Sequence, residues 1–138
     1  MAKTEKRRIG DIGEEVACKY LINKGFSVRE RNYWKPWGEI DIVAENVDFI
    51  SFVEVKTVSR KGRAGEFSPS ADSRARRETV RPEENMHPAK LKRLHRAVQT
   101  YLLDRKIPEN REWRIDLACV FLDHETKRAR VEILENII

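Results

Sequence analysis

Two apolar runs, GEIDIVA at residues 38–44 and FISFVEVK at residues 49–56, decide the fold of this chain. Each run has the length and the β-branched and aromatic composition of a strand, and the short polar segment between them predicts a hairpin. Asp41, Glu54 and Lys56 interrupt these otherwise apolar runs. Because an uncompensated charge in a buried strand costs free energy, these three residues need a specific role.

The hairpin also predicts which charged side chains meet. A turn centred on residues 47–48 places Asp41 opposite Glu54 and Glu39 opposite Lys56, with paired Cβ atoms about 5 Å apart. Since alternate strand residues share a face, three carboxylates and one amine would gather on one patch of sheet. Adjacent carboxylates repel each other unless a cation lies between them, so we expect a bound metal ion.

This patch has the chemistry needed to hydrolyse a phosphodiester bond. The carboxylates of Asp41 and Glu54 and the backbone carbonyl of Val55 are oxygen ligands, which Mg²⁺ prefers and which Mn²⁺ can share. Lys56 would orient the attacking water or stabilise the developing oxyanion, and Glu14 could hold a second cation or a bridging water. The alternative is that these strand charges form ordinary surface ion pairs, each contributing under about 1 kcal/mol, and that Glu14 is a solvated helix charge.

The other elements are read from hydrophobic spacing and turn residues. The predicted order is a helix at 10–24, strands at 26–34, 38–44 and 49–56, a helix beginning near Pro88, and strands at 113–122 and 129–134. This is an α/β fold in a single domain, residues 1–138, preceded by a basic arm at 1–8. The charged segment 59–86 predicts a mobile loop, either closing over a bound polyanion or serving only as a solvated insertion.

The composition limits the kinds of molecule that the protein is expected to bind. The net charge of +5 favours a polyanion, although a merely well-solvated protein would look the same. Cys18 and Cys119 lie far apart without a CxxC motif, which argues against zinc or a disulfide framework. No apolar run reaches the roughly 20 residues of a membrane helix, so we expect a cytoplasmic protein without a membrane partner.

We expect DNA, not a small molecule, as the substrate. Basic side chains in the arm, the charged segment and the second helix would contact phosphates without reading sequence. The candidates are Lys3, Arg7, Arg8, Arg60, Lys61, Arg63, Lys90 and Arg93. Binding of this kind weakens steeply as the salt concentration rises.

The spacing of these motifs resembles the YraN-like family of small bacterial proteins, which are regarded as endonucleases. The resemblance rests on Gly10-x-x-Gly13-Glu14-x-x-Ala17, on residues 38–44, on Phe52-Val53-Glu54-Val55-Lys56-Thr57, and on Lys90, Tyr101-Leu102 and Arg114-Ile115-Asp116. That family is similar to archaeal Holliday junction resolvases and is grouped with the restriction-endonuclease-like PD-(D/E)xK nucleases.

The resemblance implies a mixed β-sheet flanked by helices and a magnesium-dependent endonuclease acting on branched or structured DNA. It assigns metal-binding and catalytic roles to Asp41, Glu54 and Lys56, makes Glu14 the helix-borne acid, and suits a symmetric homodimer. The chain departs from the family at Val58, where a basic residue is common, and in the length of segment 59–86.

Two other classes of function remain open from the sequence. The chain could be a non-catalytic nucleic-acid-binding or adaptor domain on a nuclease fold, or a protein-interaction module whose acids pair with lysines. An acidic patch without a metal ion would hinder DNA binding, so retention of the acids favours the enzyme.

Overall fold

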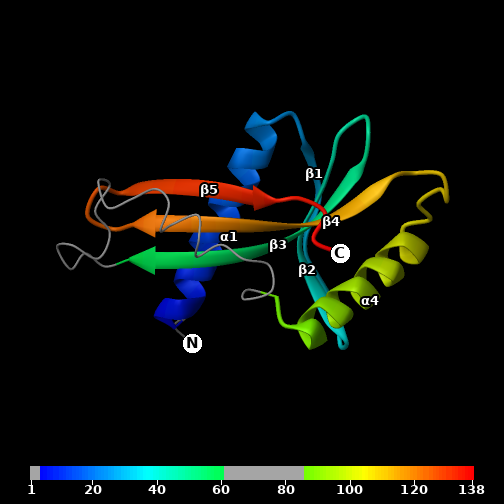
Figure 1. Cartoon of the computed structure of the whole chain (residues 1–138), viewed down its shortest axis with the longest axis horizontal. Coiled ribbons are helices and arrows are strands. Elements are labelled where there is room, and N and C mark those ends of the chain that lie inside the picture. The colour runs from blue at the N-terminus through cyan, green and yellow to red at the C-terminus, as the bar shows by residue number, and fades with distance from the viewer. Residues whose placement is uncertain (1–3, 61–85) are drawn as a thin grey trace.

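The computed structural model describes residues 4–60 and 86–138, and the elements in this part of the chain follow the predicted order (Figure 1). They are α1 (Glu5–Asn23), β1 (Ser27–Lys35), β2 (Gly38–Glu45), β3 (Ile50–Arg60), α4 (Pro88–Asp104), β4 (Trp113–Asp123) and β5 (Arg128–Leu134). The predicted α/β fold is therefore confirmed. Lys3, Lys61, Arg63 and most of segment 59–86 lie outside the described residues.

One mixed five-stranded sheet, in the order β1-β2-β3-β4-β5, forms the centre of the fold. Only β3 and β4 pair in parallel, and the other neighbouring strands are antiparallel. A parallel pair needs a crossover connection, and α4 lies in the connection between these two strands. The parallel ladder extends to Arg60 and Asp123, so β3 continues two residues into the segment that the sequence predicted as a loop.

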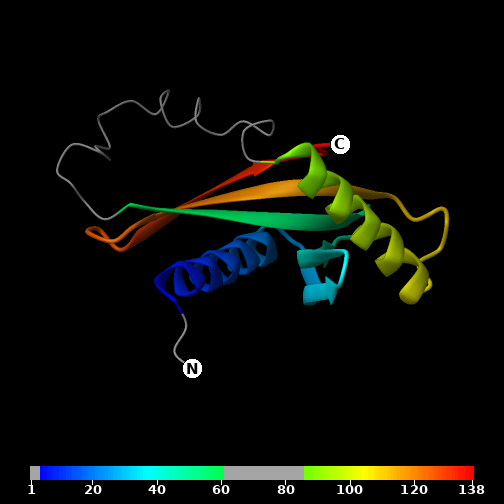
Figure 2. The same cartoon turned by 90° about the horizontal axis from the view of Figure 1, so that it is seen from below.

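Helices α1 and α4 cover opposite faces of the sheet (Figure 2). Leu21 of α1 packs in one buried cluster with Val53, whereas Tyr101 of α4 packs in another with Phe52. Phe52 and Val53 are successive strand residues and therefore point to opposite faces, and both are fully buried. Burial on both faces explains why the sequence of β3 is almost continuously apolar until its charged residues. None of the helices in the described part is both long and apolar enough to span a membrane.

Helix α1 begins five residues earlier than the apolar spacing predicted. Thr4 is its N-cap, with its side-chain Oγ1 accepting a hydrogen bond from the Arg7 backbone N–H at 3.1 Å. Glu5 adds a negative charge to the first turn, where the helix dipole favours one. Arg7 and Arg8 are consequently helical residues at one end of α1, and the described part of the predicted basic arm is not an extended segment.

Two glycines allow helices to approach strands closely. A Cβ on Gly13 of α1 would lie 1.8 Å from Thr57 Oγ1 on β3. A Cβ on Gly38 at the start of β2 would lie 2.4 Å from the backbone carbonyl oxygen of Arg93 on α4. Each glycine directly precedes an acidic residue of the chain, Glu14 or Glu39, so these close contacts hold the backbone next to two acids.

Candidate active site

Asp41 lies where the hairpin between β2 and β3 separates. The paired residues run from Glu45 and Ile50 to Ile42 and Val53, and this is the register that the sequence predicted. The ladder stops there, one step before Asp41. Consequently neither of the predicted pairs, Asp41 with Glu54 and Glu39 with Lys56, belongs to the paired ladder.

The separation follows from a rotation of β2 at Asp41. Ile40 packs in the cluster beneath α4, whereas Ile42 packs in the cluster beneath α1. In a regular strand these two residues would share a face. On the neighbouring strand, Asn32 lies between the residues that pair with Ile40 and Ile42, and its φ of 53° is in the left-handed region. Both strands are therefore irregular next to Asp41.

The Asp41 side chain forms a hydrogen bond to β3 at the point where the backbone pairing between β2 and β3 has ended. Its Oδ2 accepts a hydrogen bond from the backbone N–H of Val55 at 2.8 Å. Had the register continued, Val55 would have paired with Ile40. Because the N–H and C=O of one strand residue point to the same neighbouring strand, the Val55 carbonyl also faces the side from which Asp41 approaches.

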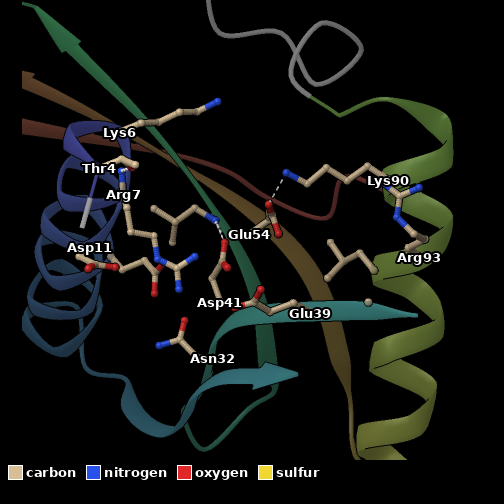
Figure 3. A pocket seen from close by; sticks show the side chains of 15 residues that line it. Thr4, Lys6, Arg7, Asp11, Asn32, Glu39, Asp41, Glu54, Lys90 and Arg93 are labelled. Atoms are coloured by element: carbon tan, nitrogen blue, oxygen red, sulfur yellow. Dashed lines mark hydrogen bonds and ion pairs between the residues drawn. The ribbon is translucent and has the colours of Figure 1, made fainter. Parts of the chain in front are cut away.

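Glu54 is almost entirely buried, and Lys90 neutralises it from the first turn of α4. The Lys90 Nζ lies 2.7 Å from Glu54 Oε1, and Glu54 is only 7% exposed. Glu54 is two residues after Phe52 and so points to the face that α4 covers. Figure 3 shows the carboxylates of Glu54, Asp41 and Glu39 close together between the two helices.

Asp41 and Glu54 differ in their electrostatic surroundings. Burial and the negative charge of Glu54 together raise the pKa of Asp41 from its ordinary value of 3.8 to about 8, although the hydrogen bond from the Val55 N–H opposes the shift. Burial also raises the pKa of Glu14, with Arg31 opposing that shift and Glu39 adding to it. Since Glu54 has Lys90 as a partner, a proton shared by the pair would reside on Asp41.

These acids line a cleft of about 620 Å³ between α1 and α4. Its acidic side chains are Asp11, Glu14, Glu39, Asp41 and Glu54, and its basic side chains are Lys6, Arg7, Lys90 and Arg93. In Figure 3 the α1 residues and the α4 residues stand on opposite sides of Asp41 and Glu54. A concave acidic centre between two cationic walls suits a ligand with negative groups that reach a cation at the centre.

The sequence-predicted residues divide into those that meet here and those that do not. Glu14, Asp41, Glu54 and Val55 line the cleft, and the exposed Lys56 lines an adjoining cleft of about 800 Å³ together with Glu14, Glu54 and Val55. Of the predicted phosphate contacts, Arg7, Lys90 and Arg93 line the first cleft. Arg8 is exposed on the same turn as Arg7, and Arg60 ends β3.

The oxygen donors of the cleft are of the chemical type that hard divalent cations take. Within residues 4–60 and 86–138, no three acidic, histidine or cysteine side chains gather closely enough to form a complete metal site. The contacts with Val55 and Lys90 occupy one oxygen each of Asp41 and Glu54. Two carboxylates and one backbone carbonyl are a typical partial ligand set for Mg²⁺, which retains waters in the remaining positions.

Sequence reasoning did not single out four polar residues that line the cleft: Thr4, Lys6, Asp11 and Asn32. Lys6 belongs to the predicted basic arm at 1–8 but was not among its predicted phosphate contacts. Lys6, Gly10 and Glu14 follow at four-residue spacing, which places them on one helix face, and that spacing could have indicated Lys6. Asn32 carried a weaker signal, since asparagine is the residue after glycine that best tolerates the left-handed conformation.

The Arg114-Ile115-Asp116 motif has a structural role apart from this cleft. Asp116 is buried and accepts hydrogen bonds from the Ser51 hydroxyl, from Arg114 Nε at 3.0 Å and from the Asn136 backbone N–H at 2.8 Å. These contacts join β3, β4 and the C-terminal residues. These donors satisfy the hydrogen-bonding capacity of the buried carboxylate.

The fold and the cleft define a small α/β protein in which two acidic residues, one on β2 and one on β3, lie where the hydrogen-bonded pairing of these two strands ends. The profile of the uncharacterised protein family UPF0102 matches residues 13–120, and the chain belongs to this family, which is the YraN-like family. A UPF0102 protein of Moorella thermoacetica is 35% identical over 135 residues, covering 98% of each chain. A UPF0102 protein of Alkaliphilus oremlandii is 34% identical, covering 94% of this chain and 97% of the relative.

Proposed function

We propose that this protein is a metal-dependent endonuclease that hydrolyses phosphodiester bonds in structured DNA, with Mg²⁺ as the metal and Mn²⁺ as a substitute. The observation that carries the proposal is that the carboxylates of Asp41 and Glu54 lie together in a cleft bordered by cationic side chains. The basic walls attract a polyanion, whereas the acids would repel it. A bound cation at the acids removes this conflict.

Asp41, Glu54 and the Val55 carbonyl would hold the metal. When bound, Mg²⁺ would supply positive charge that stabilises the phosphate in the transition state. Hydrogen bonding to Val55 fixes the Asp41 carboxylate, and the ion pair with Lys90 fixes that of Glu54, so both ligands are oriented before substrate arrives.

Lys56 would act on the phosphate and on the attacking water. Its ammonium group is exposed and forms no ion pair with the described residues, so its three N–H donors are available for a water or a phosphate oxygen. Glu14 lies in both clefts and would hold a second cation or a bridging water from the α1 side. Lys56 would therefore assist the reaction from β3, and Glu14 would assist it from α1.

The cationic walls would position the DNA backbone. Lys6 and Arg7 project from the first turns of α1, and Arg93 projects from α4 on the other side of the acids (Figure 3). These groups contact phosphates and not base edges, so the proposal includes no sequence specificity.

A cleavage assay with matched variants tests this function. Wild-type protein would be incubated with four-way junction, flap, single-stranded and duplex DNA in Mg²⁺, Mn²⁺ or EDTA. Asp41→Asn, Glu54→Gln and Lys56→Ala should each abolish metal-dependent cleavage. Asp48→Asn, an exposed acid on the same hairpin, and Lys92→Ala, an exposed lysine on α4, should cleave as the wild type does.

The alternatives predict different results. A non-catalytic binding or adaptor domain would bind DNA in a salt-dependent manner but cleave no substrate, and Lys56→Ala would then lower affinity at most slightly. A protein-interaction module would neither bind nor cleave DNA. Cleavage that persists in purified Asp41→Asn protein would indicate a contaminating nuclease and would contradict the proposal.

A further inference from the structure

Trp34 is a large exposed aromatic residue on β1, directly opposite Glu39, which lines the cleft. The side chain is 65% exposed, and the residue pairs with Glu39 across the β1–β2 hairpin. Directly opposed strand residues share a face. The neighbouring pair, Tyr33 and Ile40, packs beneath α4, so Trp34 and Glu39 point to the other face. Trp34 is therefore the strand neighbour of a residue that lines the cleft and points to the same face of the sheet as that residue.

The hairpin that presents Trp34 is fastened to α4. Trp37 Nε1 donates a hydrogen bond to Thr100 Oγ1 at 3.2 Å, and the Arg96 guanidinium stacks 4.7 Å from the centre of the Trp37 ring. Gly38 lies directly against the backbone of α4. Because these contacts already order the turn, a ligand that stacks on Trp34 would pay little additional conformational entropy.

The Trp34 ring has no structural partner in the described part of the chain. No ring contact or hydrogen bond joins it to residues 4–60 or 86–138. The other two tryptophans differ, since Trp37 contacts α4 and Trp113 packs edge-to-face on Phe52 with ring centres 5.9 Å apart. Trp34 therefore contributes little to the core, and its face is available to a ligand.

We propose that Trp34 stacks on an unpaired DNA base next to the phosphate bound in the cleft. This inference rests on the proposed function and names its substrate class more closely: DNA with a single-stranded segment beside the cleavage point. In a continuous duplex both faces of each base are already stacked, whereas an unpaired base exposes a face to an aromatic side chain. Lys6, Arg7 and Arg93 supply the charge that holds the adjoining backbone.

Fluorescence provides a direct test, because the chain has three tryptophans. The Trp37→Phe/Trp113→Phe variant leaves Trp34 as the only indole, and Asp41→Asn added to it blocks cleavage. Titration with a short oligothymidylate should quench the emission of Trp34 to saturation. A blunt duplex of the same length should bind with little quenching. Quenching by neither DNA, while both bind, would overturn the proposal.

Affinities measured with otherwise unaltered tryptophans give an independent readout. In the Asp41→Asn protein, Trp34→Ala should weaken binding of single-stranded and forked DNA about 10-fold and binding of duplex less than about twofold. Trp34→Phe should retain most of the affinity. Leu103→Ala, which removes a side chain that is 81% exposed, is the surface control and should change nothing. Equal losses on duplex and single strands, or a Phe variant as weak as the Ala variant, would overturn the proposal.

These tests separate the two proposals. Stacking measured in a cleavage-blocked protein does not depend on turnover. If Trp34 responds to single strands but the wild type cleaves nothing in Mg²⁺ or Mn²⁺, the stacking site stands and the nuclease proposal fails. If the wild type cleaves and Trp34→Ala leaves the preference among DNA structures unchanged, the stacking proposal fails and the nuclease proposal stands.

Discussion

Lys90 lies 2.7 Å from Glu54, so a helix on one face of the sheet neutralises one of the two central acids. Asp41 receives only a backbone hydrogen bond, from Val55. The site therefore carries its own cation for one carboxylate and leaves the other with a strongly raised pKa. This asymmetry leads to specific expectations for stability, pH dependence and metal binding.

Removing Lys90 should destabilise the protein. In Lys90→Met, the buried Glu54 carboxylate would lose its partner, and we expect the free energy of unfolding at pH 7 to fall by about 1–2 kcal/mol, below the value for a fully buried pair because the Lys90 side chain is half exposed. Urea denaturation measures this change. Lys92→Met is the matched control on the same helix, and an equal effect of both substitutions would show that the ion pair contributes nothing.

Asp41 should make stability fall as pH rises. Its folded-state pKa of about 8 lies above the ordinary value of 3.8, so the folded protein holds this proton more tightly than the unfolded chain does. The stabilisation is complete below about pH 4 and is lost as pH rises through 8. Asp41→Asn should therefore raise the free energy of unfolding at pH 9 by roughly 2–5 kcal/mol and have little effect at pH 4.

Urea denaturation from pH 4 to pH 9 measures this dependence. The Asn side chain can still accept the hydrogen bond from Val55, so the comparison isolates the charge. Glu109→Gln, an exposed acid in a turn, serves as the control and should follow the wild-type curve. Parallel curves for the wild type and Asp41→Asn would contradict a raised pKa.

Divalent cations should stabilise the folded protein through Asp41 and Glu54. A ligand present at about 100 times its dissociation constant adds about 2.7 kcal/mol to the free energy of unfolding. We expect Mn²⁺ and Mg²⁺ to raise the melting temperature of the wild type after treatment with EDTA. Neither Asp41→Asn nor Glu54→Gln should respond, whereas Asp48→Asn should respond fully. Calorimetric titration with Mn²⁺ provides the binding stoichiometry, and equal heats for wild type and Asp41→Asn would exclude this pair as the ligands.

Two glycines of α1 should respond in opposite directions to alanine. A Cβ at Gly13 would meet Thr57 at 1.8 Å, so Gly13→Ala should lower the free energy of unfolding by about 1–3 kcal/mol or more. A Cβ at Gly10 has no neighbour within 4 Å, so Gly10→Ala should raise it by about 0.5–1 kcal/mol through helix propensity. Thermal or urea denaturation measures both, and a neutral Gly13→Ala would contradict the close packing of α1 on β3.

The order of the elements could be predicted from sequence because its signals are local. Alternation in residues 38–44 and 49–56, and the proline that begins α4, each lie within one element. The start of α1 could not be found in this way. Thr4 and Glu5 are capping signals, but the polar first turns have little apolar spacing to reveal a helix.

The candidate site was only partly predictable for a different reason. The register of the β2–β3 hairpin follows from the length of its turn, which correctly brought Asp41 towards Glu54. The rotation at Asp41 depends on α4, because Gly38 and Ile40 pack against that helix. A contact between segments more than 50 residues apart leaves no mark on the local pattern, so the early end of the ladder was not foreseen.

The parallel pairing of β3 with β4 has a consequence for the order of assembly. Ile50 pairs with Trp113, a separation of 63 residues (113 minus 50), whereas the hairpin that carries both central acids closes over a few residues. Long-range pairings form slowly because their loop entropy must be lost first. During synthesis at the ribosome, we therefore expect the carboxylates of Asp41 and Glu54 to approach each other well before Lys90 reaches Glu54. In that interval the nascent chain would have no Lys90 ammonium group to neutralise the acidic pair.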